Sequence, residues 1–176
     1  MIENDAILDP EKLLKACDIK NEHDVADFGC GPGIFSIPIA RMTEGTVYCF
    51  DVLESALEAV KSRAQIIGLS NIVTRRANLE KEGGSGLDSD SVNHVIMRKI
   101  LLQNEDREAL FREANRILLN DGKLLIVGWT DAAVKGFGTE SRLDEDSVKQ
   151  FAQATGFSNH EALDAGQYHY AFIFTK

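Results

Sequence analysis

The residues from Asp27 to Gly33 have the types and spacing of a turn that binds a ligand. Gly29, Gly31 and Gly33 alternate after the acid, and an apolar run with helical periodicity follows them. Because glycine has no Cβ, this turn lets bare backbone approach a ligand, and the helix expected after it adds N–H groups. The pattern predicts a binding site at the end of a buried strand. The Asp27 carboxylate at its rim either contacts the ligand, or caps the following helix or hydrogen-bonds the loop.

Two later segments extend this site. Asp51 directly follows the strand-like run 46–50, where a carboxylate can accept two hydrogen bonds from a ribose diol. Residues 77–80 follow the next strand and offer the Asn78 amide and backbone N–H groups to an adenine edge. Residues 97–100 follow the fourth strand and are expected to face the remaining part of the ligand. The three segments together predict a site for a nucleotide-like cofactor.

Alternating strands and helices are expected to position these residues. Strands are expected at 24–28, 46–50, 72–74, 91–97, 123–127, after Phe157, and at 168–175, and helices at 10–16, 34–42, 54–67, 106–118 and 144–155. Alternation of this kind predicts a doubly wound α/β fold, with a mostly parallel sheet and helices on both faces. Only a short turn, 164–167, separates the last two strands, so the last strand must be antiparallel.

Size and charge narrow the function classes. At 176 residues, with 44% apolar and 27% charged residues, the chain is expected to form one domain, 1–176. The net charge of −9 repels phosphate backbones and anionic lipids, so nucleic acid and membranes are poor partners. No run approaches the ~20 apolar residues of a membrane span, and the acidic N-terminus does not resemble a secretory signal. A cytoplasmic location is expected.

The cysteines and histidines predict no metal site. Cys17, Cys30 and Cys49 have no paired spacing and no histidines in metal register, so reduced thiols are expected. Three histidines, at 23, 94 and 160, have no chemical context and are expected on the surface or in loops.

The motifs together resemble the class I S-adenosylmethionine-dependent methyltransferases, across nearly the whole chain. The resemblance is closest to the small-molecule branch typified by ubiquinone and menaquinone biosynthesis. It implies a seven-stranded sheet of order 3-2-1-4-5-7-6. It also implies that the glycine turn passes the methionine part of the cofactor, that Asp51 binds the ribose, and that Asn78 and Leu79 contact adenine. The cofactor-binding residues implied are Asp27, Gly29, Cys30, Gly31, Gly33, Asp51, Val52, Asn78, Leu79 and Met97.

The chain departs from the family pattern at several positions, and this keeps alternatives open. Asn78 and Asn93 stand where many relatives carry acids, and Arg98–Lys99 replaces small or apolar residues. A cationic pair is unfavourable near a sulfonium unless it turns outward. A non-catalytic S-adenosylmethionine-binding module or partner subunit is therefore the alternative. An NAD-dependent oxidoreductase fits less well, because Ile34 stands where the dinucleotide fingerprint requires glycine.

The expected reaction is in-line displacement of the methyl group onto a small-molecule acceptor. A neutral acceptor needs a proton acceptor, for which His169 is the candidate, with Tyr168 or Gln103 as positioning groups. Trp129, after the fifth strand, either lines a substrate pocket or packs in the core. The chain has no spare length for a substrate domain. A lid is expected from the N-terminal segment 1–20, from the loop 130–143, or from the partner in a homodimer.

Overall fold

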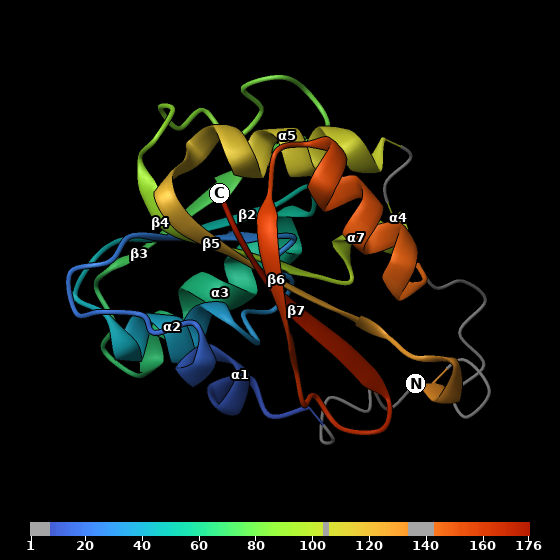
Figure 1. Cartoon of the computed structure of the whole chain (residues 1–176). Coiled ribbons are helices and arrows are strands. Elements are labelled where there is room, and N and C mark those ends of the chain that lie inside the picture. The colour runs from blue at the N-terminus through green and yellow to red at the C-terminus, as the bar shows by residue number, and fades with distance from the viewer. Residues whose placement is uncertain (1–7, 104–105, 134–142) are drawn as a thin grey trace.

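A computed structural model describes residues 8–103, 106–133 and 143–176, which form one sheet with helices on both faces (Figure 1). The strands are β1 (Val25–Phe28), β2 (Val47–Asp51), β3 (Ile72–Arg76), β4 (Val92–Arg98), β5 (Leu118–Trp129), β6 (Ser158–Leu163) and β7 (His169–Thr175). The helices are α1 (Pro10–Ala16), α2 (Ser36–Met42), α3 (Glu54–Ile66), α4 (Ile100–Gln103), α5 (Arg107–Ile117) and α7 (Glu145–Ala154).

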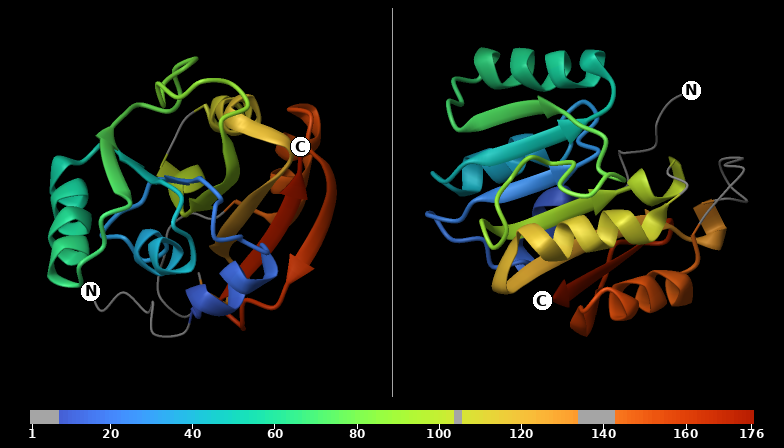
Figure 2. Two further views of the ribbon diagram at one scale, coloured as in Figure 1. Left: turned by 90° about the vertical axis from the view of Figure 1, so that its left-hand side faces the viewer. Right: turned by 90° about the horizontal axis from the view of Figure 1, so that it is seen from above.

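The sheet confirms the expected topology. Its strand order is β3-β2-β1-β4-β5-β7-β6, and β1 through β5 pair in parallel. β7 lies between β5 and β6 and is antiparallel to both. The carboxyl ends of β1, β2, β3, β4 and β5 therefore share one edge of the sheet with the beginning of β7. In Figure 2, α3 lies toward the β3 side of the sheet and α7 toward the other side.

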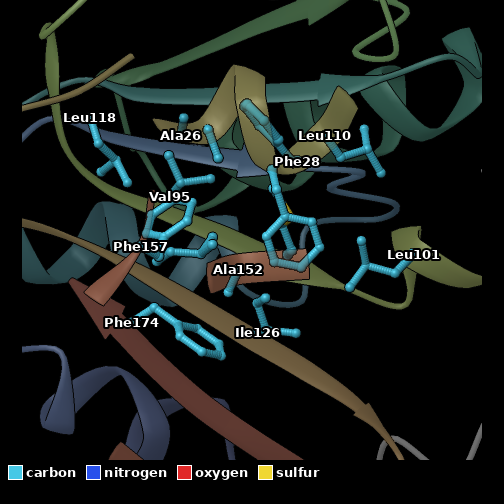
Figure 3. Close-up of a cluster of buried hydrophobic side chains, with 14 of the residues drawn as sticks. Ala26, Phe28, Val95, Leu101, Leu110, Leu118, Ile126, Ala152, Phe157 and Phe174 are labelled. Atoms are coloured by element: carbon cyan, nitrogen blue, oxygen red, sulfur yellow. The ribbon is translucent and has the colours of Figure 1, made fainter. Parts of the chain in front are cut away.

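Side-chain alternation along the strands divides the core into two layers. Ala26 and Phe28 of β1 face α5 and α7, where they join a cluster that includes Leu110 and Phe157 (Figure 3). Val25 faces the opposite layer, with residues of α1, α2 and α3. Strands covered on both faces must be apolar throughout, which accounts for the near-continuous hydrophobic runs in the sequence.

Three local features differ from the expected elements. Helix α2 begins at Ser36 rather than Ile34, because the turn continues through Gly33, whose φ is +86°. The expected turn at 120–122 lies inside β5, where the β4–β5 register shifts between Val92 and His94. The short helix α4 was not expected. The apolar residues of 100–103 are too few to show a helical period.

The expectation that His94 lies on the surface or in a loop is wrong. His94 is a residue of β4 and is only 3% exposed, and its Nε2 lies 2.9 Å from His23 Nδ1. Burial, together with the charges of His23 and Lys123, lowers the pKa of His94 to about 4. No local pattern predicts this pair, because the two histidines are brought together by the pairing of β1 with β4.

Two expected lid segments are described only in part. Helix α1 begins as expected, with the Asp9 carboxylate accepting a hydrogen bond from the Lys12 N–H at 3.0 Å and Pro10 at the first helical position. The remainder of the N-terminal segment, 1–7, and most of the 130–143 loop lie outside the described residues.

Candidate active site

The glycine turn is fixed to the neighbouring strand by its backbone. The N–H groups of Gly29 and Cys30 both donate to the Phe50 carbonyl of β2, each at 2.9 Å. Gly29 and Gly31 have φ values of +71° and +51°, which L-residues with a Cβ rarely adopt. A Cβ at Gly29 would also lie 3.0 Å from Ile100, whereas one at Gly31 would meet no atom within 4 Å. The turn is therefore held rigidly, with open space above Gly31.

The Asp51 carboxylate is oriented by the same turn. Its Oδ2 accepts a hydrogen bond from the Gly31 N–H at 3.0 Å, and its Oδ1 accepts one from the Leu53 N–H at 2.9 Å. A carboxylate has about four lone-pair directions, so each oxygen can accept one further donor. This geometry fits a ligand diol, because both oxygens are already fixed toward the cleft by backbone groups.

A cleft of about 510 Å³ lies over these residues, within the size range of small-molecule sites. Six of the cofactor-site residues expected from the sequence line it: Gly29, Gly31, Asp51, Val52, Asn78 and Leu79. Leu79 is buried, whereas Asn78 is exposed and its Oδ1 accepts a hydrogen bond from the Glu80 N–H at 3.0 Å. The cleft extends from the glycine turn to residues 77–80.

Four other expected site residues do not line the cleft. Asp27 is 2% exposed and accepts a hydrogen bond from Ser36 Oγ at 2.5 Å, at the beginning of α2. Burial raises the pKa of Asp27 to about 6, although the Ser36 hydrogen bonds oppose the shift. Its carboxylate therefore holds the beginning of α2 and does not face the cleft.

Cys30, Gly33 and Met97 are also turned away from the cleft. The neighbouring Cys49 side chain and burial raise the pKa of the Cys30 thiol, which keeps it protonated. A Cβ at Gly33 would lie 3.1 Å from Val60, so this glycine allows α3 to pack closely. The Met97 side chain is fully buried in the α5 layer.

The far end of the cleft contains residues that the sequence did not assign to the cofactor site. Arg98, Lys99 and Ile100 line it, and the two cations are half-buried there rather than turned fully outward. Lys99 has a φ of +61°, and its Nζ lies 4.5 Å from the centre of the Trp129 ring. The only sequence signal for this arrangement was the unusual cationic pair after the fourth strand.

Both expected catalytic residues lie at this edge of the sheet. The His169 ring stacks on Trp129 with centroids 4.5 Å apart, at an interplanar angle of 26°. Burial lowers the pKa of His169 to about 4, with further contributions from Arg98 and Lys99. Tyr168 lies beside it and is half-buried. A neutral imidazole of this kind can accept a proton or a hydrogen bond from a ligand.

The described residues contain no cluster of three or more side chains suited to holding a metal ion. None of the helices in the described ranges has the length and apolar character that a bilayer span requires.

Comparison with known proteins agrees with this geometry. Residues 25–122 match the family described as "Methyltransferase domain". Methyltransferase GfsG of Streptomyces halstedii is 29% identical over 72% of this chain and 44% of its own length. Ribosomal protein L11 methyltransferase of Syntrophomonas wolfei is 24% identical over 77% of this chain and 42% of its own length. The chain thus spans less than half the length of these curated relatives.

The fold is also that of solved methyltransferase structures. A SAM-dependent methyltransferase from Aquifex aeolicus superimposes with a TM-score of 0.85 at 20% sequence identity, over 99% of this chain and 93% of the other. The expected cofactor, S-adenosylmethionine, agrees with the matched family and with the residues that line the cleft. The matched region contains the glycine turn, Asp51 and the cationic pair, and it covers more than half of the chain, which therefore belongs to the methyltransferase domain family.

Proposed function

We propose that this chain transfers a methyl group from S-adenosylmethionine to a small-molecule acceptor. The observation that carries the proposal is the oriented Asp51 carboxylate beside the glycine turn, in a cleft that ends at Asn78. The turn, the carboxylate and the 77–80 segment would hold the methionine, ribose and adenine parts respectively. When bound, the cofactor supplies the reactive sulfonium, and the protein supplies proximity and orientation.

The acceptor class is supported by charge. The net charge of −9 opposes association with nucleic acid, although one matched relative is named as a 23S rRNA methyltransferase and another as a ribosomal protein L11 methyltransferase. The charge favours a small molecule over a nucleic acid.

His169 is the proposed proton acceptor, with Tyr168 beside it as a positioning group. Its lowered pKa leaves the imidazole neutral above about pH 4, so its lone pair is available at neutral pH. If His169 acts this way, His169→Gln lowers kcat and leaves the affinity for S-adenosylhomocysteine unchanged. The rate should also show no inflection from this group between about pH 6 and 8.

Calorimetry followed by turnover tests the proposal. S-adenosylhomocysteine should bind the wild-type protein, and NADH should not. Formation of S-adenosylhomocysteine is then measured with small acids, phenols and amines, with a ribosomal RNA fragment, and with ribosomal protein L11. Turnover on a small molecule supports the proposal, and turnover on the polymers alone contradicts the acceptor class. Failure to bind S-adenosylhomocysteine overturns the function altogether.

The second candidate is a non-catalytic S-adenosylmethionine-binding module. It is favoured by the amides at Asn78 and Asn93 and by the cationic pair that lines the cleft. Binding of S-adenosylhomocysteine without turnover on any acceptor of the panel would select this candidate.

A further inference from the structure

Two cationic side chains line the far end of the cleft, in a chain whose net charge is −9. Arg98, the last residue of β4, and Lys99 both line the cleft and are half-buried. The described acids that line the cleft, Asp51 and Glu80, belong to the half formed by the segments after β2 and β3. The two adjacent cations are thus grouped at one end of the cleft, apart from its described acids.

Lys99 has an unusual backbone conformation at the edge of the cleft. Its φ of +61° lies in the left-handed region, which glycine and asparagine adopt at lower cost than lysine. Such strain persists where the surrounding structure holds it, and it is concentrated at functional sites. Here the Lys99 N–H donates to the Val127 carbonyl at 3.3 Å, and the ammonium lies over the Trp129 ring. The conformation fixes a positive charge at the wall of the cleft.

The stacked rings of Trp129 and His169 lie beside Lys99 at this edge of the sheet, next to the residues that line the cleft. Arg98 pairs with Val127, and Trp129 pairs with His169, so these side chains project to the same face of the sheet. His169 is 3% exposed, and among the described residues neither of its ring nitrogens has a hydrogen-bond partner. Buried polar atoms are normally paired, so this imidazole points to a polar ligand.

We propose that Arg98 and Lys99 form a carboxylate-binding subsite at the far end of the cleft, with Trp129 and His169 as its wall. A guanidinium can bind a carboxylate through two parallel hydrogen bonds, and the neighbouring ammonium adds a point charge. Within the proposed function, an anion here also offsets the repulsion between these cations and a sulfonium. The carboxylate can come from the acceptor or from the amino-acid part of the cofactor. The wall extends away from the glycine turn across β5 and β7, which favours the acceptor.

Four ligands test the subsite in titrations of the wild-type protein, Arg98→Gln, Lys99→Gln and the control Lys61→Gln. Lys61 is an exposed residue of α3 that lies outside the cleft. S-adenosylhomocysteine carries the amino-acid carboxylate, and methylthioadenosine lacks it. Benzoate carries a carboxylate on a ring, and benzamide is its uncharged counterpart. Lys99→Gly is a second variant, because it relieves the backbone strain while removing the ammonium.

The expected result is that benzoate binds and benzamide does not, with and without saturating S-adenosylhomocysteine. Each cation-removing variant should weaken benzoate binding about 10-fold, as expected for loss of a charged hydrogen bond. Lys61→Gln should leave the affinity for benzoate unchanged. Lys99→Gly should raise the melting temperature of the protein and still weaken benzoate binding. The cation variants are also compared on the cofactor analogues. If their affinity for S-adenosylhomocysteine falls by a similar factor while that for methylthioadenosine does not, the subsite is supported and the carboxylate it binds is that of the cofactor.

Two results overturn the subsite. One is that neither benzoate nor S-adenosylhomocysteine distinguishes the cation variants from the control. The other is that the cation variants bind all four ligands more weakly, which would show that Arg98 and Lys99 maintain the shape of the cleft rather than bind a carboxylate. Failure of the wild-type protein to bind S-adenosylhomocysteine is a different outcome: it removes the proposed function, while the benzoate and benzamide comparison on the free protein still decides the subsite.

Discussion

The two halves of the cleft are built by different kinds of contact. In the half after β1, β2 and β3, backbone N–H groups orient the polar side chains: those of Gly31 and Leu53 donate to Asp51, and that of Glu80 donates to Asn78. All of these contacts join residues within a turn or between adjacent parallel strands.

The half after β4 is lined by Arg98 and Lys99, and these lie beside two rings that are far from them in the sequence. Lys99, Trp129 and His169 meet only because β4, β5 and β7 are neighbours in the sheet. Burial and the nearby cations keep His169 neutral. The first half is therefore specified by short motifs, and the second by topology. This difference predicts that single substitutions in the first half act mainly on cofactor affinity, whereas those in the second act on the acceptor.

The largest effect is expected from Asp51→Ala. Loss of a carboxylate that would accept two ribose hydroxyl donors should weaken S-adenosylhomocysteine binding about 10²-fold or more, since hydrogen bonds to charged groups contribute about 1.5–3 kcal/mol each. Calorimetry measures this, with the exposed nearby residue Glu54→Gln as the control. Unchanged affinity in Asp51→Ala would remove the main support for the cofactor half.

Asp27→Asn tests whether the acid before the glycine turn has a structural role or contacts the ligand. The folded-state pKa, about 6, lies above the ordinary value of 3.8. The folded protein therefore binds this proton more tightly than the unfolded chain does. Stability is lost as the pH rises from about 4 to 6, by up to about 3 kcal/mol. Asparagine cannot ionise and can still accept the Ser36 hydroxyl, so the variant should be more stable by about 1–3 kcal/mol at pH 7.

Urea unfolding at pH 4 and pH 7 measures this change. The gain should be small at pH 4, where Asp27 is largely protonated in the folded protein. Ser36→Ala serves as the comparison, because it removes the hydrogen bond and keeps the acid. A variant that is less stable than wild type at pH 7 would show that the ionised carboxylate itself holds the turn.

Much of the first half of the cleft could be predicted from sequence, because its contacts lie within turns or between adjacent strands. The glycine turn, Asp51 and Asn78 follow predicted strands directly, so local spacing places them at the carboxyl edge. The burial of Asp27 and Met97 could not be predicted with the same ease, because strand alternation gives a face but not what covers it. His94 was misassigned for the same reason, although it lies within the strand expected at 91–97. The juxtaposition of Trp129 with His169 needs the β5–β7 register, which no local pattern contains.

Gly29→Ala compared with Gly31→Ala probes the boundary between the halves. Both glycines have positive φ, so each substitution should destabilise the fold by about 1–2 kcal/mol. Only at Gly29 would the new methyl group meet Ile100 of the second half, at 3.0 Å. Crowding should add about 1 kcal/mol at Gly29 alone. Thermal unfolding measures the difference, and Gly29→Ala with Ile100→Val should recover part of it. Equal destabilisation by the two single variants would mean that Gly29 is not closely packed against Ile100.

Asn78→Ala should have the smallest effect, because this side chain is exposed and its Oδ1 already accepts the Glu80 N–H. Loss of one neutral hydrogen bond contributes about 0.5–1.5 kcal/mol, so S-adenosylhomocysteine affinity should fall by about 10-fold or less. Asn78→Asp is the matched variant: it keeps an acceptor for Glu80 and presents the acid expected in many relatives. If Asn78→Asp strengthens binding while Asn78→Ala weakens it, the side chain at position 78 accepts a hydrogen bond from the adenine end of the ligand. A loss of about 10²-fold in Asn78→Ala would instead place the amide among the principal anchors of the cofactor half, equal to Asp51.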